Sequence, residues 1–530
     1  MNLDDKHQRI PVPKWRALSG TPSAELVSAG SVQPDRELAL ARADRMHALY
    51  ARWQAAPTID NALELLDCSS FIDDKGLFYG PAAQIINSRE VTKTSKFVAQ
   101  QVIRPDRVWL VPSYDVKTRK HIHRAIAENR KRLLEEARNG LLHAEQARLY
   151  AIIDQTEAAE YSFAKALSAT PDNRHILRSF ARFMVHVGQP EIALRKLRKS
   201  AAIASDPWVQ AAEIALSEYH NVGSLVAKSA SKMLDALQFR REHTSELATA
   251  LATLEWHTGH RKRFNKRLKE SLSHPSENAL AQATWLIREA PSDLPDEMSE
   301  LLLPMFGRSA EARTYALLKQ KHWGEAIDSF VKWQDEESFS QHIAIEGSFY
   351  AISFAKNYDA AISICRNGLI ANSTSHSLLN NLCYAERRRG YVNDAVKTMV
   401  RLKSVYSAWK SSPVYLATDG MLNFALGNHD AGRAMYLEAL DTAKAQKDEA
   451  LSRRVKMHWL QEEALSGAVT KSQAERLVSR IQTELEEAGK SEEMSEYWQY
   501  MKEQIQAMSA KSGELHSQQR AEPHFIESHL

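Results

Sequence analysis

The sequence predicts an all-α protein in which helical hairpins stack into a solenoid. Only 19 Gly and 17 Pro occur in 530 residues, and so few helix breakers favour helices joined by short turns. A layout of about 34 residues also recurs along the chain, as in proteins built from helical repeats. Because each hairpin leaves an apolar face that only its neighbour covers, such repeats form one continuous stack.

The residues before the repeats divide into two predicted parts. Residues 1–34 are rich in Pro, Ser, Gly and polar residues, and we expect them to form a flexible N-terminal arm. We expect degenerate N-terminal helical hairpins in residues 35–139, beginning with an amphipathic helix in the stretch 34–54. The stretch RVWLVP at 107–112 favours extended backbone, but it is too short to predict a sheet.

The clearest repeat is the stretch AEQARLYAIIDQTEAAEYSFAKALSATP at residues 144–171. Ala147 lies in a first helix and Ala159 follows in a second helix, with Phe163 and the closing Pro171 after it. Two antiparallel helices approach closely only where small side chains face each other, which explains the two alanines. The large residue fills the gap to the next repeat, and in several copies a Gly ends the first helix in a left-handed turn.

Six further copies follow the same layout. Their markers include Ala193 with Leu197, Phe264 with Leu268, Ala326 with Phe330, Ala361 with Cys365, Ala395 with Met399, and Gly432 with Tyr436. These residues resemble the tetratricopeptide repeat (TPR), whose A-x3-F-x2-A-L-x3-P pattern is matched in full at 159–171. The resemblance implies a right-handed superhelical solenoid, with a TPR array in residues 140–445. Weaker helical pairs are expected at 208–236 and 277–303.

The residues after the array are predicted to close it. Residues 446–512 contain three stretches with helical periodicity and many charges, and we expect C-terminal capping helices whose polar outer surface ends the solenoid. Residues 513–530 are polar, and we expect a disordered tail.

The three cysteines favour packing over chemistry. They are odd in number and widely separated, which fits neither a disulfide framework nor a metal site. Cys383 takes the small-residue position of its repeat and Cys365 the large apolar position, so we expect both thiols to be buried. The chain has no signal-peptide pattern and no run of about 18 apolar residues, so we expect a cytoplasmic protein without a membrane span.

No motif for catalysis or cofactor binding occurs in the sequence. It contains no P-loop, dinucleotide fingerprint, nucleophile elbow, HExxH motif or CxxC pair. His121 and His123 are two positions apart, so on a helix they point to different sides and make a poor metal pair. We therefore expect neither an enzyme nor a cofactor or metal site. The alternative is an enzyme hidden in residues 1–135 or 445–530.

The resemblance also implies a binding groove. In TPR proteins the first helix of each pair lines a concave groove, and its binding positions carry over onto this chain. The residues expected to contact a partner are Arg148, His175, Arg178, Arg182, Trp256, His257, Tyr315, Lys319, Tyr350, Tyr384, Arg387 and Arg388. Among the groove positions only Glu246, Glu311 and Glu346 are acidic, which predicts a basic, aromatic-lined groove on a chain of net charge +3. The alternative for any one of these charges is an ordinary solvated helix surface.

Two functions from different classes follow. The first is a non-enzymatic TPR scaffold or sensor that binds an acidic protein or peptide segment in this groove. Proteins of this kind often serve as the regulatory subunit of an effector enzyme, for example in bacterial stress or anti-phage defence. The alternative is a helical-repeat protein that binds nucleic acid, with arginines on phosphates and aromatic rings on bases. The sequence indicates neither the oligomeric state nor the identity of the partner.

Overall fold

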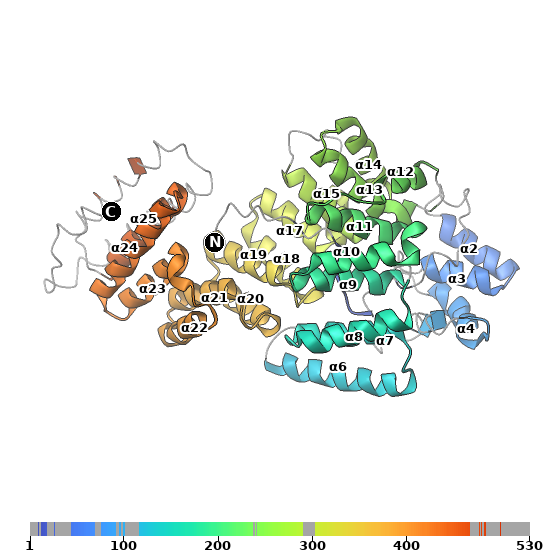
Figure 1. Ribbon diagram of the computed structural model, residues 1–530, viewed down its shortest axis with the longest axis horizontal. Helices are drawn as coiled ribbons and strands as arrows, with labels where there is room; N and C mark the ends of the chain where they lie inside the picture. The colour runs from blue at the N-terminus through green and yellow to red at the C-terminus, as the bar shows by residue number, and fades with distance from the viewer. Residues whose placement is uncertain are drawn as a thin grey trace. The chain divides into compact units, whose positions relative to one another are not determined.

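The structure is a computed structural model of the chain (Figure 1). It describes residues 9, 12–18, 26, 44–68, 76–91, 95–96, 99–100, 116–236, 239, 241–289, 303–466, 476, 479, 482–483 and 499. The described residues form helices and turns without a β-strand, as the sequence predicts. The predicted extended stretch 107–112, the residues 513–530 and most of 467–512 lie outside the described residues.

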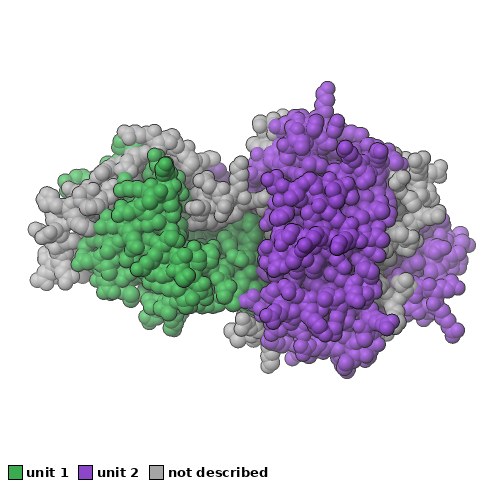
Figure 2. All heavy atoms as spheres, in the orientation of Figure 1, with its two compact units in different colours: residues 1–6, 341–530 green, residues 7–340 purple. Residues whose placement is uncertain are grey.

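The chain divides into two compact units (Figure 2). Residues 7–340 form one, here called the amino-terminal unit, and residues 341–530 with residues 1–6 form the other, the carboxy-terminal unit. Each unit is a stack of helical hairpins.

The amino-terminal unit begins with short helices and continues as a row of hairpins. The short helices are α2 (Asp44–Ala55), α3 (Ile59–Cys68), α4 (Tyr79–Asn87) and the longer α6 (Val116–Glu135). The first three hairpins pair α7 (Gly140–Ile152) with α8 (Thr156–Ala169), α9 (Arg174–His186) with α10 (Pro190–Lys199), and α11 (Pro207–Tyr219) with α12 (Ala227–Asp235). Two more pair α13 (Arg241–His257) with α14 (Arg261–Ser273), and α17 (Ala310–Lys319) with α18 (Trp323–Glu336). Helix α15 (Glu277–Glu289) packs on both α13 and α17.

The carboxy-terminal unit continues the same architecture. It pairs α19 (Gln341–Ser353) with α20 (Tyr358–Ala371), α21 (His376–Arg389) with α22 (Val392–Val405), and α23 (Pro413–Ala425) with α24 (His429–Ala445), and it ends in α25 (Glu449–Leu465). In both units each first helix also packs on the first helix of the next pair, from α7 to α17 and from α19 to α25. We call the layer of first helices in each unit its inner face.

The repeat markers occupy the positions that the pattern predicts. The small residues Ala159, Ala181, Ala326 and Ala361 are fully buried between helices, and so are large residues such as Phe163. Small side chains there let the two helices of a pair approach closely. At Gly420 an added Cβ would lie 2.9 Å from the Tyr436 ring and 3.1 Å from the Gly432 carbonyl, so the α23–α24 contact requires glycine. The same residues that identify the repeat therefore set the spacing of its helices.

The helix ends follow from local sequence. Many first helices start at an Asn, Asp or Ser whose side chain accepts a backbone N–H of the first turn; these caps are Asn139, Asn173, Asp206, Ser309, Ser375 and Asp448. The turn that follows the first helix contains a residue with positive φ, and this residue is glycine at positions 188, 259, 390 and 427. The equivalent turns after α7, α17 and α19 use Asp154, Lys321 and Lys356 instead.

Candidate functional site

Three arginines predicted to line the groove are buried in ion pairs on the inner face of the amino-terminal unit. Arg148 pairs with Glu145 at 2.6 Å, Arg178 with Glu246 at 2.7 Å and Arg182 with Glu337 at 2.5 Å. Because each guanidinium is matched by a carboxylate at contact distance, these residues give the inner face no surplus of positive charge. Residue spacing located these arginines but not the acids that fold against them.

His175, another predicted groove residue, is held neutral inside the same layer. Burial, together with the charges of Arg178 and Arg148, lowers the pKa of His175 to about 3. Its Nε2 lies 3.4 Å from the Ser179 hydroxyl oxygen. At neutral pH this imidazole is a packed polar group and not a cation that attracts an acidic partner.

The inner face of the amino-terminal unit is occupied by the chain's own residues 9 and 12–18, which we call the arm segment. Arg9 donates from Nε to Glu311 Oε1 on α17 at 2.5 Å. Arg182 on α9 donates to the backbone oxygen of Val12 at 3.4 Å. The arm segment therefore contacts first helices that are distant from one another in the sequence.

Trp15 anchors the arm segment. Its side chain is 1% exposed, and its ring centroids lie 4.8 Å from Phe163, 5.8 Å from Phe183 and 5.2 Å from Phe339. A tryptophan removed from water among aromatic rings contributes strongly to packing. This differs from the flexible arm expected for residues 1–34: the composition is typical of disorder, but the few apolar residues here meet a complementary surface.

The other predicted groove residues of this unit do not form one surface. Tyr315 is fully buried, with its ring centroid 5.5 Å from that of Trp333. Trp256 is half-buried at the end of α13, whereas the neighbouring His257 and, on α17, Lys319 are exposed. These four positions therefore divide between core packing and solvent.

In the carboxy-terminal unit, Arg387 and Arg388 both contact the fully buried carboxylate of Glu462. The closest N–O distances are 3.3 Å and 2.7 Å. The guanidinium of Arg388 also lies 5.0 Å above the ring of Tyr384, within range of a cation–π interaction. Two guanidinium groups on one carboxylate leave one positive charge in excess within this trio.

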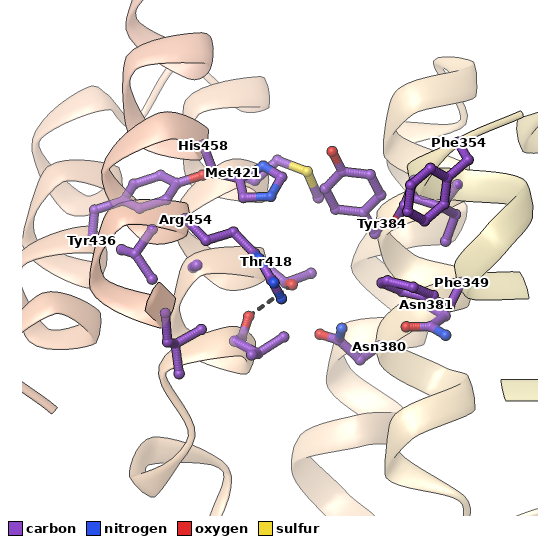
Figure 3. Close-up of a pocket in the computed structure, with 16 residues that line it drawn as sticks. Phe349, Phe354, Asn380, Asn381, Tyr384, Thr418, Met421, Tyr436, Arg454 and His458 are labelled. Carbon is purple, nitrogen blue, oxygen red and sulfur yellow. Dashed lines mark hydrogen bonds between the residues drawn. The ribbon is translucent and has the colours of Figure 1, made fainter. Parts of the chain in front are cut away.

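A cavity of about 130 Å³ opens on the inner face of the carboxy-terminal unit (Figure 3), and Tyr384, which Arg388 covers, is one of its lining residues. Helices α19 and α21 form one wall, and helices α23, α24 and α25 form the facing wall. The labelled lining residues are Phe349, Phe354, Asn380, Asn381 and Tyr384 on the first wall, and Thr418, Met421, Tyr436, Arg454 and His458 on the second. The walls are mainly apolar and aromatic, and the volume suits one large apolar side chain.

Two asparagines add a polar edge to this cavity. Asn381 Nδ2 donates to Ser348 Oγ at 2.9 Å. Asn380 is 6% exposed, and its Oδ1 accepts no hydrogen bond among the described residues. A buried amide oxygen without a donor costs free energy, which a ligand N–H placed in the cavity would recover.

The electrostatic surroundings of the cavity are positive. Removal from water lowers the pKa of His458 well below its ordinary value, and the charges of Arg388 and Arg454 lower it further. Burial and Arg388 likewise lower the pKa of Lys356 to about 7. Burial is the largest cause of both shifts, and the arginine charges act in the same direction. A ligand that carries a negative charge fits such a region.

The predicted groove residues include one on the α19–α21 wall of this cavity and none on the facing wall. Tyr384 was predicted and lines it, whereas Tyr350, also predicted, stacks on Phe354 next to the lining. Arg454 and His458 were missed because residues after 445 were interpreted as a polar cap. Their spacing of four, which places both on one face of α25, was the available signal.

The described residues contain no metal cluster, and the thiols of Cys365 and Cys383 are buried. No group of three His, Cys, Asp or Glu side chains among them is arranged to hold a metal ion. Burial raises the pKa of Cys365 to about 12, and the buried Cys383 donates from Sγ to the Ala395 carbonyl at 3.4 Å, so the packing role predicted for both is confirmed. None of the described helices is long and apolar enough to cross a bilayer.

Comparisons with known proteins give distant structural neighbours only. No protein-family model and no curated protein matches the chain. A solved structure of the human IFIT1 dimer with PPP-AAAA aligns with 13% identity and a TM-score of 0.33, covering 77% of this chain and 97% of that one. The yeast Tom70 structure aligns with 10% identity and a TM-score of 0.29, covering 88% and 96%. At such scores the likeness carries no inference, so the proposals below rest on the geometry of this chain.

Proposed function

We propose that the protein is a non-catalytic helical-repeat scaffold that captures a partner protein in the cavity of the carboxy-terminal unit. The segment it holds is a peptide with one large apolar or aromatic side chain next to an acidic residue. The observation that carries this proposal is the cavity itself, with apolar walls, a buried acceptor and surrounding cations in one place.

Each part of the cavity matches one part of such a segment. The apolar walls around Met421 and Tyr384 take the large side chain, whose burial supplies most of the affinity. The free Oδ1 of Asn380 accepts a backbone N–H of the peptide, because an extended chain presents donors that its own structure does not use. Arg454 supplies a charge-assisted hydrogen bond to the acidic group.

The sharpest test compares Arg454→Glu with Arg453→Glu. Both substitutions reverse one charge on α25, but Arg453 is not part of the cavity and pairs with the exposed Glu449. The probe is an array of 12-residue peptides with one aromatic or aliphatic residue flanked by Asp or Glu, and the best binder is titrated by fluorescence anisotropy. We expect Arg454→Glu to weaken binding by about tenfold or more, as for a lost charge-assisted contact, and Arg453→Glu by less than about twofold.

Two results would count against this function. Equal losses in the two variants would show that binding depends on overall charge and not on the cavity. Strong binding of a 12-residue RNA, with affinity that falls steeply as salt increases, would favour the nucleic-acid alternative. If a partner identified with the best peptide sequence carries a catalytic domain, that result would support the role of regulatory subunit.

A further inference from the structure

Three carboxylates around the arm segment form ion pairs with its basic side chains. Lys14 contacts Glu277 at 2.7 Å and Glu336 at 2.6 Å, and Arg16 also contacts Glu277. Arg9 contacts Glu311 at 2.5 Å. Among the described residues, the ion pairs of these three carboxylates come from the arm segment alone. Without it, these three carboxylates on α15, α17 and the end of α18 have no ion pair among the described residues.

The pKa of the buried Glu311 carboxylate also depends on the charges of the arm segment. Burial raises the pKa of Glu311, but the charges of Arg9 and Lys14, the hydrogen bond from Arg9 and the smaller effect of Arg182 on α9 outweigh burial, and the pKa lies below its ordinary value. The surface is therefore matched to a basic segment.

The arm segment also fills the available space. Trp15 sits among three phenylalanine rings, and Arg9 is held by the side chains of Gln282 and Asn278 in addition to Glu311. A cavity of about 30 Å³ remains beside Arg9 and Pro13, too small for a further peptide. Occupation by the arm segment and by any other segment is therefore mutually exclusive.

We propose that this inner face is a second peptide-binding site, specific for a basic tryptophan-bearing segment, and that the arm segment is its intrachain occupant. The recognised pattern is an arginine followed five and six positions later by lysine and tryptophan, as in Arg9, Lys14 and Trp15. A partner protein that carries this pattern occupies the site when the arm segment leaves. Attachment in the same chain raises the effective concentration of the arm to about the millimolar range, so the intact protein favours its own segment.

The experiment separates the arm from the rest of the chain without removing it. A protease site is inserted between Gly30 and Ser31, and the protein is cut after folding. The probe is a fluorescent peptide with the sequence of residues 7–18, HQRIPVPKWRAL, and its control is the same peptide with Trp15→Ala. Incorporation is followed by size-exclusion chromatography, with circular dichroism to monitor folding.

We expect the cut protein to exchange its arm for the labelled peptide, and the intact protein to incorporate at least about tenfold less. The Trp15→Ala peptide is expected not to be incorporated. If the cut protein stays folded and takes up neither peptide, or takes up both equally, the inner face is not a binding site that exchanges its occupant. Unfolding on cleavage would also overturn the proposal, because the segment would then be an integral part of the core.

One further outcome distinguishes the source of the competing segment. If the intact protein forms a concentration-dependent dimer that the labelled peptide dissolves, then a second copy of this chain supplies the segment. That result would overturn the assignment to a partner protein.

Discussion

The two inner faces of this protein are built from the same repeat and differ in how their charges are used. In the amino-terminal unit, Arg178 and Arg182 face carboxylates, and the chain's own Trp15 fills the space between helices. In the carboxy-terminal unit, Arg387 and Arg388 share one carboxylate beside an open cavity. The two arginines of the amino-terminal unit thus each have a carboxylate of their own, whereas the two of the carboxy-terminal unit share one. What separates them is the number of acids that fold against them.

The largest effect is expected from replacing Trp15, which anchors the arm segment on the inner face of the amino-terminal unit. Trp15→Ala should lower the free energy of unfolding of the amino-terminal unit by about 3–5 kcal/mol, because a fully buried tryptophan is lost from an aromatic cluster. Urea denaturation followed by circular dichroism measures the change. Tyr161→Ala is the control, since this ring is exposed and its loss should cost less than about 0.5 kcal/mol. Equal effects would mean that the arm segment is not a packed element.

Low pH should also lower the free energy of unfolding of the amino-terminal unit. The pKa of His175 is about 3 in the folded protein, below its ordinary value, so between about pH 6.5 and pH 3 the unfolded chain binds a proton that the folded chain does not. The contribution of His175 to the free energy of unfolding is therefore fully present above pH 6.5 and decreases as the pH falls below that value. Between pH 7 and pH 5 this histidine alone should cost about 2 kcal/mol.

His175→Gln tests the assignment of this acid sensitivity. Glutamine retains a polar side chain without a proton that titrates in this range, so the variant should lose about 2 kcal/mol less than the parent protein between pH 7 and pH 5. Urea midpoints at the two pH values provide the comparison. An unchanged pH dependence would assign the acid sensitivity to other groups, such as His186, whose pKa burial lowers to about 4.

An effect of similar size is expected in the carboxy-terminal unit. Gly420→Ala should destabilise the carboxy-terminal unit by about 1–3 kcal/mol, because the added Cβ meets the Tyr436 ring and the Gly432 backbone. Gly324→Ala is the matched control, since an added Cβ there meets nothing within 4 Å, and alanine favours a helix. Thermal unfolding of both variants should show one lowered transition for Gly420→Ala and none for Gly324→Ala. If Gly420→Ala lowered the temperature of both transitions, the two units would not unfold independently.

The sequence predicted the hairpins well because their determinants are local. Small residues at fixed spacing and turn glycines such as Gly188 and Gly390 are visible without a structure. The turns at Lys321 and Lys356 have the same positive φ without glycine, so the spacing of neighbouring markers had to locate them.

The candidate sites were harder to predict because their determinants are distant in sequence. The acid that pairs with Arg182 lies 155 positions away, and the partner of Arg9 lies 302 positions away. Composition described the residues around Trp15 as flexible, since nothing nearby in the sequence covers a tryptophan. Only the fold brings Phe163, Phe183 and Phe339 around it. Charge patterns therefore located helix faces correctly without showing which charges remain available.

The left-handed turns have a consequence for engineering. Asp154, Lys321, Lys356 and Lys447 adopt a backbone conformation that costs a side-chain-bearing residue about 1–2 kcal/mol and glycine much less. The backbone at these turns is therefore strained, and none of the four residues lines the cavity or belongs to the arm segment. Each one offers a separate adjustment of thermal tolerance, by which single hairpins of the array can be stiffened while the binding surfaces keep their sequence.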